Sequence, residues 1–171
     1  AMPKRDLFPL NLIFRSKPPD LVLMGLGNPG QEYISTRHNV GFWLVDKISL
    51  EYNIDIKRKH QLVQYGEGVF AGNRVVFAKP RTFVNNSGQA ARYLLARFGI
   101  PPQKLMIVYD DMDIPVGKIR IRGQGSPGSH NGARSVSQAL RGEEFPRLRL
   151  GIGRPHISTD QVNYVLGEPR A

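Results

Sequence analysis

The chain has 171 residues, of which 40% are hydrophobic, so it is long enough to bury one core of ordinary size. It contains no cysteine, which excludes a disulfide scaffold and any site built on cysteine thiolates. The 24 Lys and Arg residues outnumber the 14 Asp and Glu residues. The net charge of +10 favours a polyanionic partner, nucleic acid above all, over the alternative that the charge serves solubility alone.

The organisation of the chain indicates one domain after a short tail. Residues 1–20 are basic and interrupted by prolines, so we expect a flexible N-terminal extension there and a single α/β domain over residues 21–171. No apolar run reaches the length that a bilayer-spanning helix needs. The extension also lacks the continuous apolar stretch of a signal peptide, which together with the missing cysteines favours a cytoplasmic protein without a membrane partner.

Short apolar runs alternate along the chain with segments of helical periodicity. We predict strands at residues 20–27, 61–70, 73–80, 104–113, 117–122 and 147–153. We predict helices at residues 40–52, 85–99, 131–142 and 158–167. A turn at Ala71-Gly72-Asn73 joins the second and third strands into a hairpin, which interrupts the simple strand–helix alternation. The expected fold class is therefore α/β, a single-domain three-layer sandwich in which helices cover both faces of a mixed β-sheet.

Local features of these elements can also be predicted. Asn39 stands in the N-cap position of the first helix, and Gly99 stands just past the end of the second. Phe42 and Trp43 are expected to be core residues of the first helix rather than platforms on which bases stack. The strand at 117–122 alternates isoleucine with basic residues, which predicts one apolar face and one cationic face exposed to water.

Candidate catalytic groups lie close to the predicted strands. His38 follows Arg37 in the segment TRHNVGFW, and a neighbouring fixed cation pushes a histidine toward the neutral form that accepts a proton. His38 is therefore a candidate base. Further polar residues follow predicted strands or their loops, where open α/β sheets place their sites: Asn28, Asn85, Asp110, His130 and Asn131.

Two glycine-rich segments and an acidic cluster have more than one interpretation. GLGNPG at residues 25–30 predicts a tight turn, with a phosphate cradle as the alternative, but it lacks the spacing of the dinucleotide fingerprint. GQGSPGSHNG at residues 123–132 predicts a flexible turn that leads into a helix, whose N-terminus would also suit an anion. Asp110, Asp111 and Asp113 form either a loop of solvated acids or a cation site, although the other ligands of a calcium loop are missing.

Five motifs occur in a fixed order: GLGNPGQEYISTRHNVGF, KPRTFVNNSG, DDMDIPVGKIRIR, GSHNG and RLRLGIGRP. Together they resemble the bacterial-type peptidyl-tRNA hydrolase family, and the resemblance runs from about Leu21 to Gly167. It implies a monomeric α/β hydrolase that needs no metal or other cofactor. Such an enzyme binds peptidyl-tRNA and cleaves the ester that joins the peptide to the 3′-terminal ribose, so that tRNA and peptide are released for reuse in translation.

The resemblance implies that His38 is the catalytic base, which activates a water molecule, and that Asp110 orients the imidazole and stabilises its protonated form. This agrees with the chemistry of ester hydrolysis, which needs an oriented water and a base active near neutral pH. Water is the expected nucleophile, because the chain has no cysteine and no serine in a Gly-x-Ser-x-Gly elbow. The implied substrate-binding residues are Asn28, Tyr33, Val84, Asn85, His130 and Asn131.

These substrate-binding residues are expected to divide between the two parts of the substrate. Asn28 matches the family residue at the acceptor end of the tRNA, and Tyr33 matches the tyrosine near the terminal adenosine. Asn85 and Asn131 match residues that bind the peptide main chain, which an asparagine amide can do as donor and acceptor at once. His130 matches the histidine that gates the cleft.

Four arginines form the expected contact with tRNA phosphates. Arg122 and Arg149 match positions that lie near phosphates in the family. Arg120 shares a strand face with Arg122, and Arg134 on the following helix extends this surface. The alternative is a solvated strand face without a nucleic-acid partner.

The sequence departs from the family pattern at a few positions. Val84 stands where a methionine is common, and Ser129 replaces the usual glycine before His130. Family members generally continue past the segment matching YVLGEPR into a further helix, so we expect the domain over residues 21–171 to lack the usual C-terminal helix. Since splicing factors of plant chloroplasts resemble the same family, the alternative function is that of a non-catalytic RNA-binding or splicing factor.

Overall fold

The computed structural model describes residues 17–156 and 160–170. Within these residues, seven strands form one sheet in the order β2-β3-β4-β1-β5-β7-β6. The strands are β1 (Leu21–Gly25), β2 (Arg58–Lys59), β3 (Val63–Phe70), β4 (Asn73–Pro80), β5 (Leu105–Asp111), β6 (Ile119–Arg122) and β7 (Arg147–Gly151). The α-helices are α1 (Val40–Glu51), α2 (Ser87–Phe98), α3 (Asn131–Leu140) and α4 (Gln161–Val165). The short 3₁₀ helices are η1 (Gln31–Tyr33), η2 (Arg37–Asn39), η3 (Val84–Asn86) and η4 (Pro102–Lys104).

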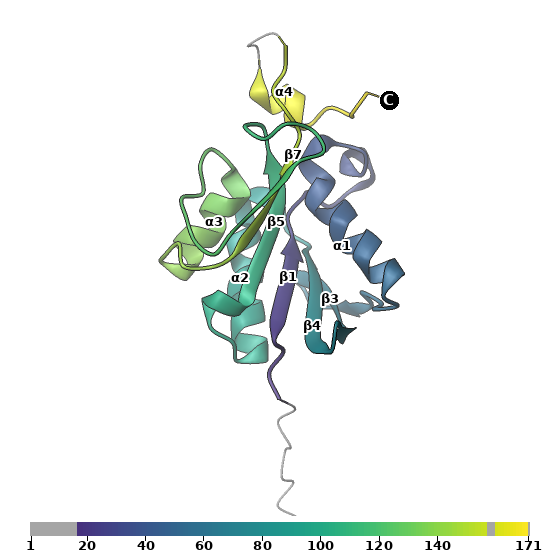
Figure 1. The fold of residues 1–171 in the computed structure, drawn as a ribbon, viewed down its shortest axis with the longest axis vertical. Helices are drawn as coiled ribbons and strands as arrows, with labels where there is room; N and C mark the ends of the chain where they lie inside the picture. The colour runs from purple at the N-terminus through teal and green to yellow at the C-terminus, as the bar shows by residue number, and fades with distance from the viewer. Residues whose placement is uncertain (1–16, 157–159, 171) are drawn as a thin grey trace, which may run out of the picture.

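The sheet lies between two helical layers, with α1 on one side and α2 and α3 on the other (Figure 1). Val45 of α1 is buried against one face, and Leu94 of α2 and Val136 of α3 are buried against the opposite face. β1 runs parallel to β4 and β5, and β5 runs parallel to β7. The pairs β3–β4 and β6–β7 are antiparallel. The predicted three-layer α/β sandwich with a mixed sheet is therefore confirmed.

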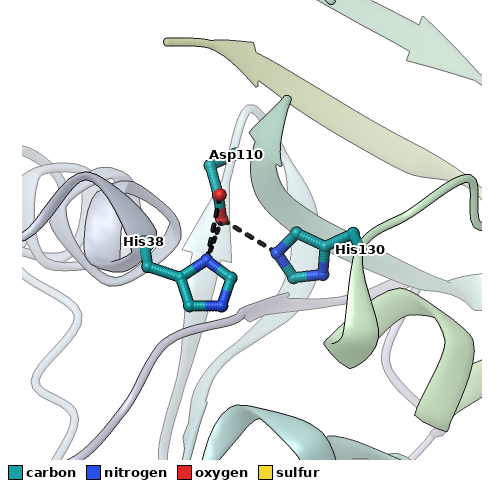
Figure 2. Close-up of side chains that lie close together, drawn as sticks. All are labelled: His38, Asp110 and His130. Atoms are coloured by element: carbon teal, nitrogen blue, oxygen red, sulfur yellow. Dashed lines mark hydrogen bonds and ion pairs between the residues drawn. The ribbon is translucent and has the colours of Figure 1, made fainter. Parts of the chain in front are cut away.

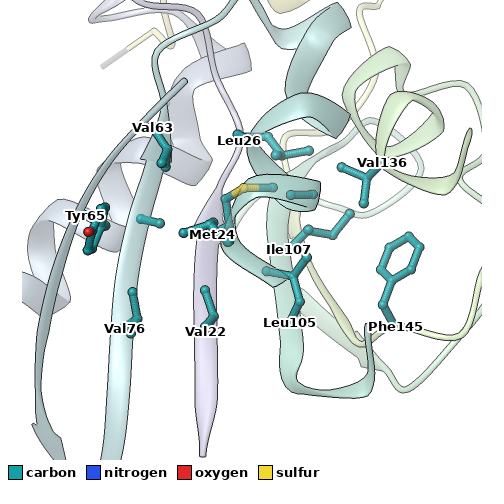
Figure 3. Packing of buried hydrophobic residues seen from close by; sticks show 14 of the residues in the cluster. Val22, Met24, Leu26, Val63, Tyr65, Val76, Leu105, Ile107, Val136 and Phe145 are labelled. Carbon is teal, nitrogen blue, oxygen red and sulfur yellow. The ribbon is translucent and has the colours of Figure 1, made fainter. Parts of the chain in front are cut away.

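Alternate side chains of the central strands build the core and thereby place the polar residues (Figure 3). Leu105 and Ile107 of β5 are buried in the cluster beneath α2 and α3, whereas Val108 is buried in the cluster beneath α1. Because successive strand residues point to opposite faces, Asp110 at the end of β5 lies on the α1 side. The carboxyl ends of the parallel strands lie together near α4, so the polar residues that follow these strands gather there (Figure 1).

The predicted turns follow from the local backbone. Ala71 and Gly72 join β3 to β4 with φ of 48° and 77°, as a two-residue hairpin turn requires. Gly99 ends α2 in the left-handed region with φ of 62°. The first glycine of GLGNPG serves close packing, because a Cβ on Gly25 would lie 2.3 Å from the carbonyl oxygen of Gly41 in α1. Glycine therefore lets β1 and α1 touch.

Other local predictions were wrong. Ile119 and Ile121, expected on a buried apolar face, are 58% and 56% exposed because β6 is an edge strand of the sheet. Trp43, expected in the core, is 37% exposed, and its indole Nε1 donates a hydrogen bond to the carbonyl of Ile34 at 2.7 Å. By contrast, Asn39 is the N-cap residue of α1, as predicted, although its side chain makes no capping hydrogen bond and binds the backbone of Asn28 instead.

The predicted N-terminal extension falls mostly on residues 1–16, which lie outside the described residues. Its last residue is tied to the sheet: the backbone N–H of Asp20 donates to the Arg74 carbonyl at 2.8 Å, and the backbone N–H of Arg74 donates to the Asp20 carboxylate at 2.9 Å. Across the described part of the chain, every helix is too short or too polar to cross a membrane.

Candidate active site

The site is centred on a buried histidine–aspartate pair (Figure 2). His38 lies in η2, just before α1, and Asp110 lies at the end of β5. The imidazole Nδ1 of His38 is 2.9 Å from both carboxylate oxygens of Asp110. An ionised carboxylate only accepts hydrogen bonds, so Nδ1 carries the proton and Nε2 keeps its lone pair in the neutral ring. The pair is thus in the tautomer that a general base needs.

A second histidine binds the same carboxylate. The imidazole Nε2 of His130 lies 2.8 Å from Oδ1 of Asp110, and its Nδ1 accepts the backbone N–H of Ala133 at 3.2 Å. His130 is therefore the N-cap of α3, and its two hydrogen bonds define a neutral ring with the proton on Nε2. The rings of His38 and His130 lie 4.8 Å apart between centroids. Asp110 is consequently held from both sides.

The two histidines also set the charge state of Asp110. Its carboxyl is 4% exposed, and burial alone would raise the pKa of Asp110. The interactions with His130 and His38 outweigh burial and hold the pKa of Asp110 well below its usual range. The carboxylate is therefore ionised wherever His38 acts as a base, and it can stabilise the imidazolium that forms.

His38, Asp110 and His130 offer three groups of the kind that bind metal ions, with ligand atoms within 4.8 Å of one another. Around a tetrahedral zinc ion, neighbouring ligand atoms lie about 3.3 Å apart and point at the metal. Here the two histidine nitrogens point at the carboxylate itself, 2.8 Å and 2.9 Å away, at hydrogen-bonding distance (Figure 2). The three side chains therefore form a hydrogen-bonded cluster, in which a proton lies between each histidine nitrogen and the carboxylate.

The cluster opens into a cavity of about 430 Å³. Its floor is the end of β5, and the glycine-rich loop that precedes α3 forms one wall. α4 forms another wall through Gln161, Val162 and Val165. Of the residues predicted from the sequence, the cavity brings together His38, Asp110, His130, Asn131 and Arg149.

Asp111 at the end of β5 and Asp113 just after it pair with arginines rather than forming a cation site. Asp111 accepts a hydrogen bond from Arg149 Nη1 at 3.1 Å, and Asp113 forms an ion pair with Arg154. Asp110 instead faces the two histidines. The three neighbouring acids therefore have different partners, and only the fold reveals which of them belongs to the site.

A second polar cluster lies beside the cavity and contains a residue that the sequence did not identify. The side chain of Asn39 accepts the backbone N–H of Asn28 and donates to its carbonyl, both at 2.9 Å. Asn28 in turn accepts the backbone N–H of buried Val84 through its Oδ1 at 2.8 Å. Asn85 follows Val84 and is exposed, so Asn39 fixes the loop that presents it.

Tyr33 lies outside the lining of the cavity that contains the His38–Asp110 pair. It lies in η1 and packs edge-on against Phe83, with ring centroids 6.1 Å apart. Phe83 is 55% exposed and directly precedes η3. The exposed ring of Phe83 and the half-buried ring of Tyr33 thus form an aromatic pair just before Asn85, outside the residues that line the cavity.

The predicted phosphate-binding arginines occupy the edge of the sheet next to the cavity. Arg120 pairs with Arg149, and Arg122 pairs with Arg147, across the β6–β7 ladder. Directly opposed residues share a face, so the four side chains project to one side. Arg120 and Arg122 are exposed, as is Arg134 on α3. Arg147 differs: it is buried and donates hydrogen bonds to the carbonyls of residues 126, 143 and 145, which makes it a structural anchor for the glycine-rich loop.

Comparisons with known proteins agree with this arrangement. The family model for peptidyl-tRNA hydrolase matches residues 22–171. The chain belongs to the peptidyl-tRNA hydrolase family. Peptidyl-tRNA hydrolases of Clostridium tetani and Bacillus licheniformis are 47% and 48% identical over 147 residues, which cover 86% of this chain and 77% and 78% of theirs. A crystal structure of the peptidyl-tRNA hydrolase from Acinetobacter baumannii is 36% identical with a TM-score of 0.83, over 91% of this chain and 80% of that one.

Membership of the peptidyl-tRNA hydrolase family confirms the resemblance that the five sequence motifs indicated. It also confirms the prediction that the chain is a hydrolase on an α/β fold. The family model includes η2, β5 and the loop before α3, so the His38–Asp110–His130 cluster lies inside the matched region.

Proposed function

We propose that this protein hydrolyses the ester bond between peptide and tRNA in peptidyl-tRNA, with His38 as the general base. The observation that carries the proposal is the 2.9 Å contact between His38 Nδ1 and the Asp110 carboxylate at an open cavity, which leaves Nε2 of His38 as the nitrogen that can accept a proton. A histidine that is held in one tautomer by a buried carboxylate is prepared to take a proton from water. The proposed substrate rests on membership of the family, and the proposed role of His38 rests on its contact with Asp110.

The proposed reaction proceeds in two steps. His38 Nε2 takes a proton from a water molecule as the water oxygen bonds to the ester carbonyl carbon, and Asp110 stabilises the resulting imidazolium. The tetrahedral intermediate then collapses: the bond to the 3′ oxygen of the ribose breaks, and that oxygen receives the proton back from His38. The products are a peptide with a free carboxyl group and a tRNA with a free 3′ hydroxyl.

The polar residues around the pair receive proposed roles in substrate binding. Asn131 at the start of α3 lines the cavity, whereas Asn85 in η3 lies outside its lining; both are exposed, so their amides are available to the peptide main chain. Asn28 and Tyr33 contact the acceptor end and its terminal adenosine. His130 lies at the end of the glycine-rich loop and binds Asp110, and its proposed role is to gate the cleft.

Hydrolysis of a purified peptidyl-tRNA, measured beside binding of uncharged tRNA, tests the proposal. The proposed enzyme acts as a monomer in the cytoplasm. The alternative, a non-catalytic RNA-binding or splicing factor, predicts tRNA binding without release of peptide. The buried His38–Asp110 pair favours the enzyme, because ester hydrolysis requires an oriented base and RNA binding does not require a buried ionised carboxylate. Failure to release peptide at high enzyme concentration would favour the binding protein.

Arg122→Ala should weaken tRNA binding and flatten its dependence on salt. When one phosphate contact is lost, tRNA binding releases fewer counterions. The slope of log affinity against log salt concentration should therefore become shallower by about one unit. Arg149→Ala should have the same effect and should also free Asp111. Lys57→Ala is the control variant. It removes an exposed cation that pairs with Asp55 next to edge strand β2, at the edge of the sheet opposite β6, and should leave the salt slope unchanged. Salt slopes equal to that of wild type in both arginine variants would place the tRNA elsewhere.

A further inference from the structure

Arg37, the neighbour of the proposed base, directs its side chain away from the catalytic pair. Its Nη1 donates to the carbonyl of Tyr164 at 3.0 Å, and its guanidinium lies 4.2 Å from the centroid of the Tyr164 ring. Its backbone N–H donates to the carbonyl of Gly167 at 2.9 Å. A Cβ on Gly167 would lie only 3.0 Å from Nη1, so glycine there leaves room for the guanidinium. All these contacts go to α4 or to the residues just after it.

α4 is a functional element because it forms a wall of the catalytic cavity through Val162 and Val165. It is short, with five residues, so packing against other elements must hold it in place. One tie is the hydroxyl of Tyr164, which donates to the carbonyl of Ile152 after β7 at 2.7 Å. The other is Arg37, which satisfies carbonyls at the C-terminal end of α4 and places a cation where the helix dipole favours one.

We propose that Arg37 is a positioning residue that holds α4 as a wall of the substrate cavity. The residue sits directly before His38 in η2, so the wall and the base are fixed by one short turn. Arg37 positions α4 through the hydrogen bond and the stacking of its guanidinium on Tyr164. Its positive charge next to His38 is not required for catalysis. The inference rests on the proposed function for its kinetic consequences, and on the contacts alone for the position of α4.

Arg37→Lys and Arg37→Met separate position from charge. Lysine keeps the charge but loses the planar fork and the stacked ring contact, and methionine loses the charge as well. If Arg37 holds the wall, both variants should lower kcat/KM by about tenfold, mainly by raising KM, without moving the acid limb of the pH profile. Arg58→Met, the same substitution on edge strand β2, is the matched control and should leave kcat/KM unchanged.

A charge effect on His38 would give the opposite pattern. Arg37→Lys would then behave like wild type, and Arg37→Met would shift the acid limb of kcat/KM to higher pH, because removal of a nearby cation raises the pKa of a histidine. That pattern would overturn the proposal. A double variant with Tyr164→Leu adds a second test. Tyr164→Leu removes the ring on which Arg37 stacks and also the hydroxyl bond to Ile152, so the two changes share only part of their contacts. The loss in the double variant should therefore be smaller than the product of the two single losses, whereas full multiplication would contradict the proposal.

Hydrogen exchange keeps the test independent of catalysis. The backbone amides of Tyr164, Leu166 and Gly167 are hydrogen-bonded within α4 and its C-terminal turn. In both Arg37 variants they should exchange about tenfold faster or more than in wild type, while amides of the core strand β1 stay protected. If wild type fails to release peptide, the proposed function fails but this measurement still decides the role of Arg37. Unchanged exchange of α4 in both variants would overturn the proposal.

Discussion

Replacing His38 with alanine should lower the rate of peptidyl-tRNA hydrolysis by about 100-fold or more, because the variant loses the group that is proposed to take the proton from the attacking water. The effect should appear in kcat, since the side chain acts on the water rather than on the bound tRNA or peptide. Single-turnover cleavage of a purified peptidyl-tRNA measures it directly. Affinity for uncharged tRNA should stay within about twofold of wild type, since His38 is proposed to act on water alone.

His38→Asn sharpens the test by separating proton transfer from structure. An asparagine amide can donate to Asp110 in place of Nδ1–H, but it cannot serve as a base. This variant should fold as stably as wild type and still lose about 100-fold in rate. His60→Asn is the matched control: His60 stacks on Tyr93 near the opposite edge of the sheet and should be dispensable. Turnover near the wild-type rate in His38→Asn would show that His38 only organises the site.

The sequence predicted those parts of the fold that local chemistry determines. The turn at Ala71 and Gly72 and the end of α2 at Gly99 depend on backbone conformations that few residues adopt, so they could be read locally. Burial could not. Ile119 and Ile121 alternate with arginines as a half-buried strand would, yet they are exposed because β6 is an edge strand. Trp43 shows the same limit, since a helical pattern does not tell which residues another layer covers.

The candidate site was predicted from motifs only as a set of residues, because its contacts join distant parts of the chain. His38 and Asp110 are 72 residues apart, and Asn28 accepts a bond from a residue 56 positions away. Nothing in the local sequence of His130 indicates that it also binds Asp110. Arg37 illustrates the same point, since its neighbour in sequence is His38 but its partner in the fold is Tyr164.

Asp110→Asn should abolish most activity although it changes a single atom. In wild type both histidines donate to the carboxylate, and the amide can accept only through its oxygen. Both histidines reach Oδ1, and Nδ1 of His38 also lies 2.9 Å from Oδ2, so in either orientation of the amide its NH₂ faces at least Nδ1 of His38 as a donor. This favours the other tautomer of the ring, which places the proton on Nε2 and leaves no base facing water. Even in the correct tautomer, the neutral amide would not stabilise the imidazolium. We therefore expect a loss of about 10³- to 10⁴-fold in kcat.

The same substitution should change how stability depends on pH. Because the pKa of Asp110 is held below its usual range in the fold, its ionised form stabilises the protein above the pKa of an unfolded aspartate, and this contribution is lost as pH falls through the lower folded pKa. Asp110→Asn cannot titrate, so its melting temperature should fall less steeply than that of wild type in acid. Asp55→Asn is the control: it removes an exposed acid that pairs with Lys57 outside the residues that line the cavity, and it should keep both the activity and the acid dependence of wild type. If Asp110→Asn matched wild type in rate at every pH, another group would have to orient His38, and the pair could not be the catalytic unit.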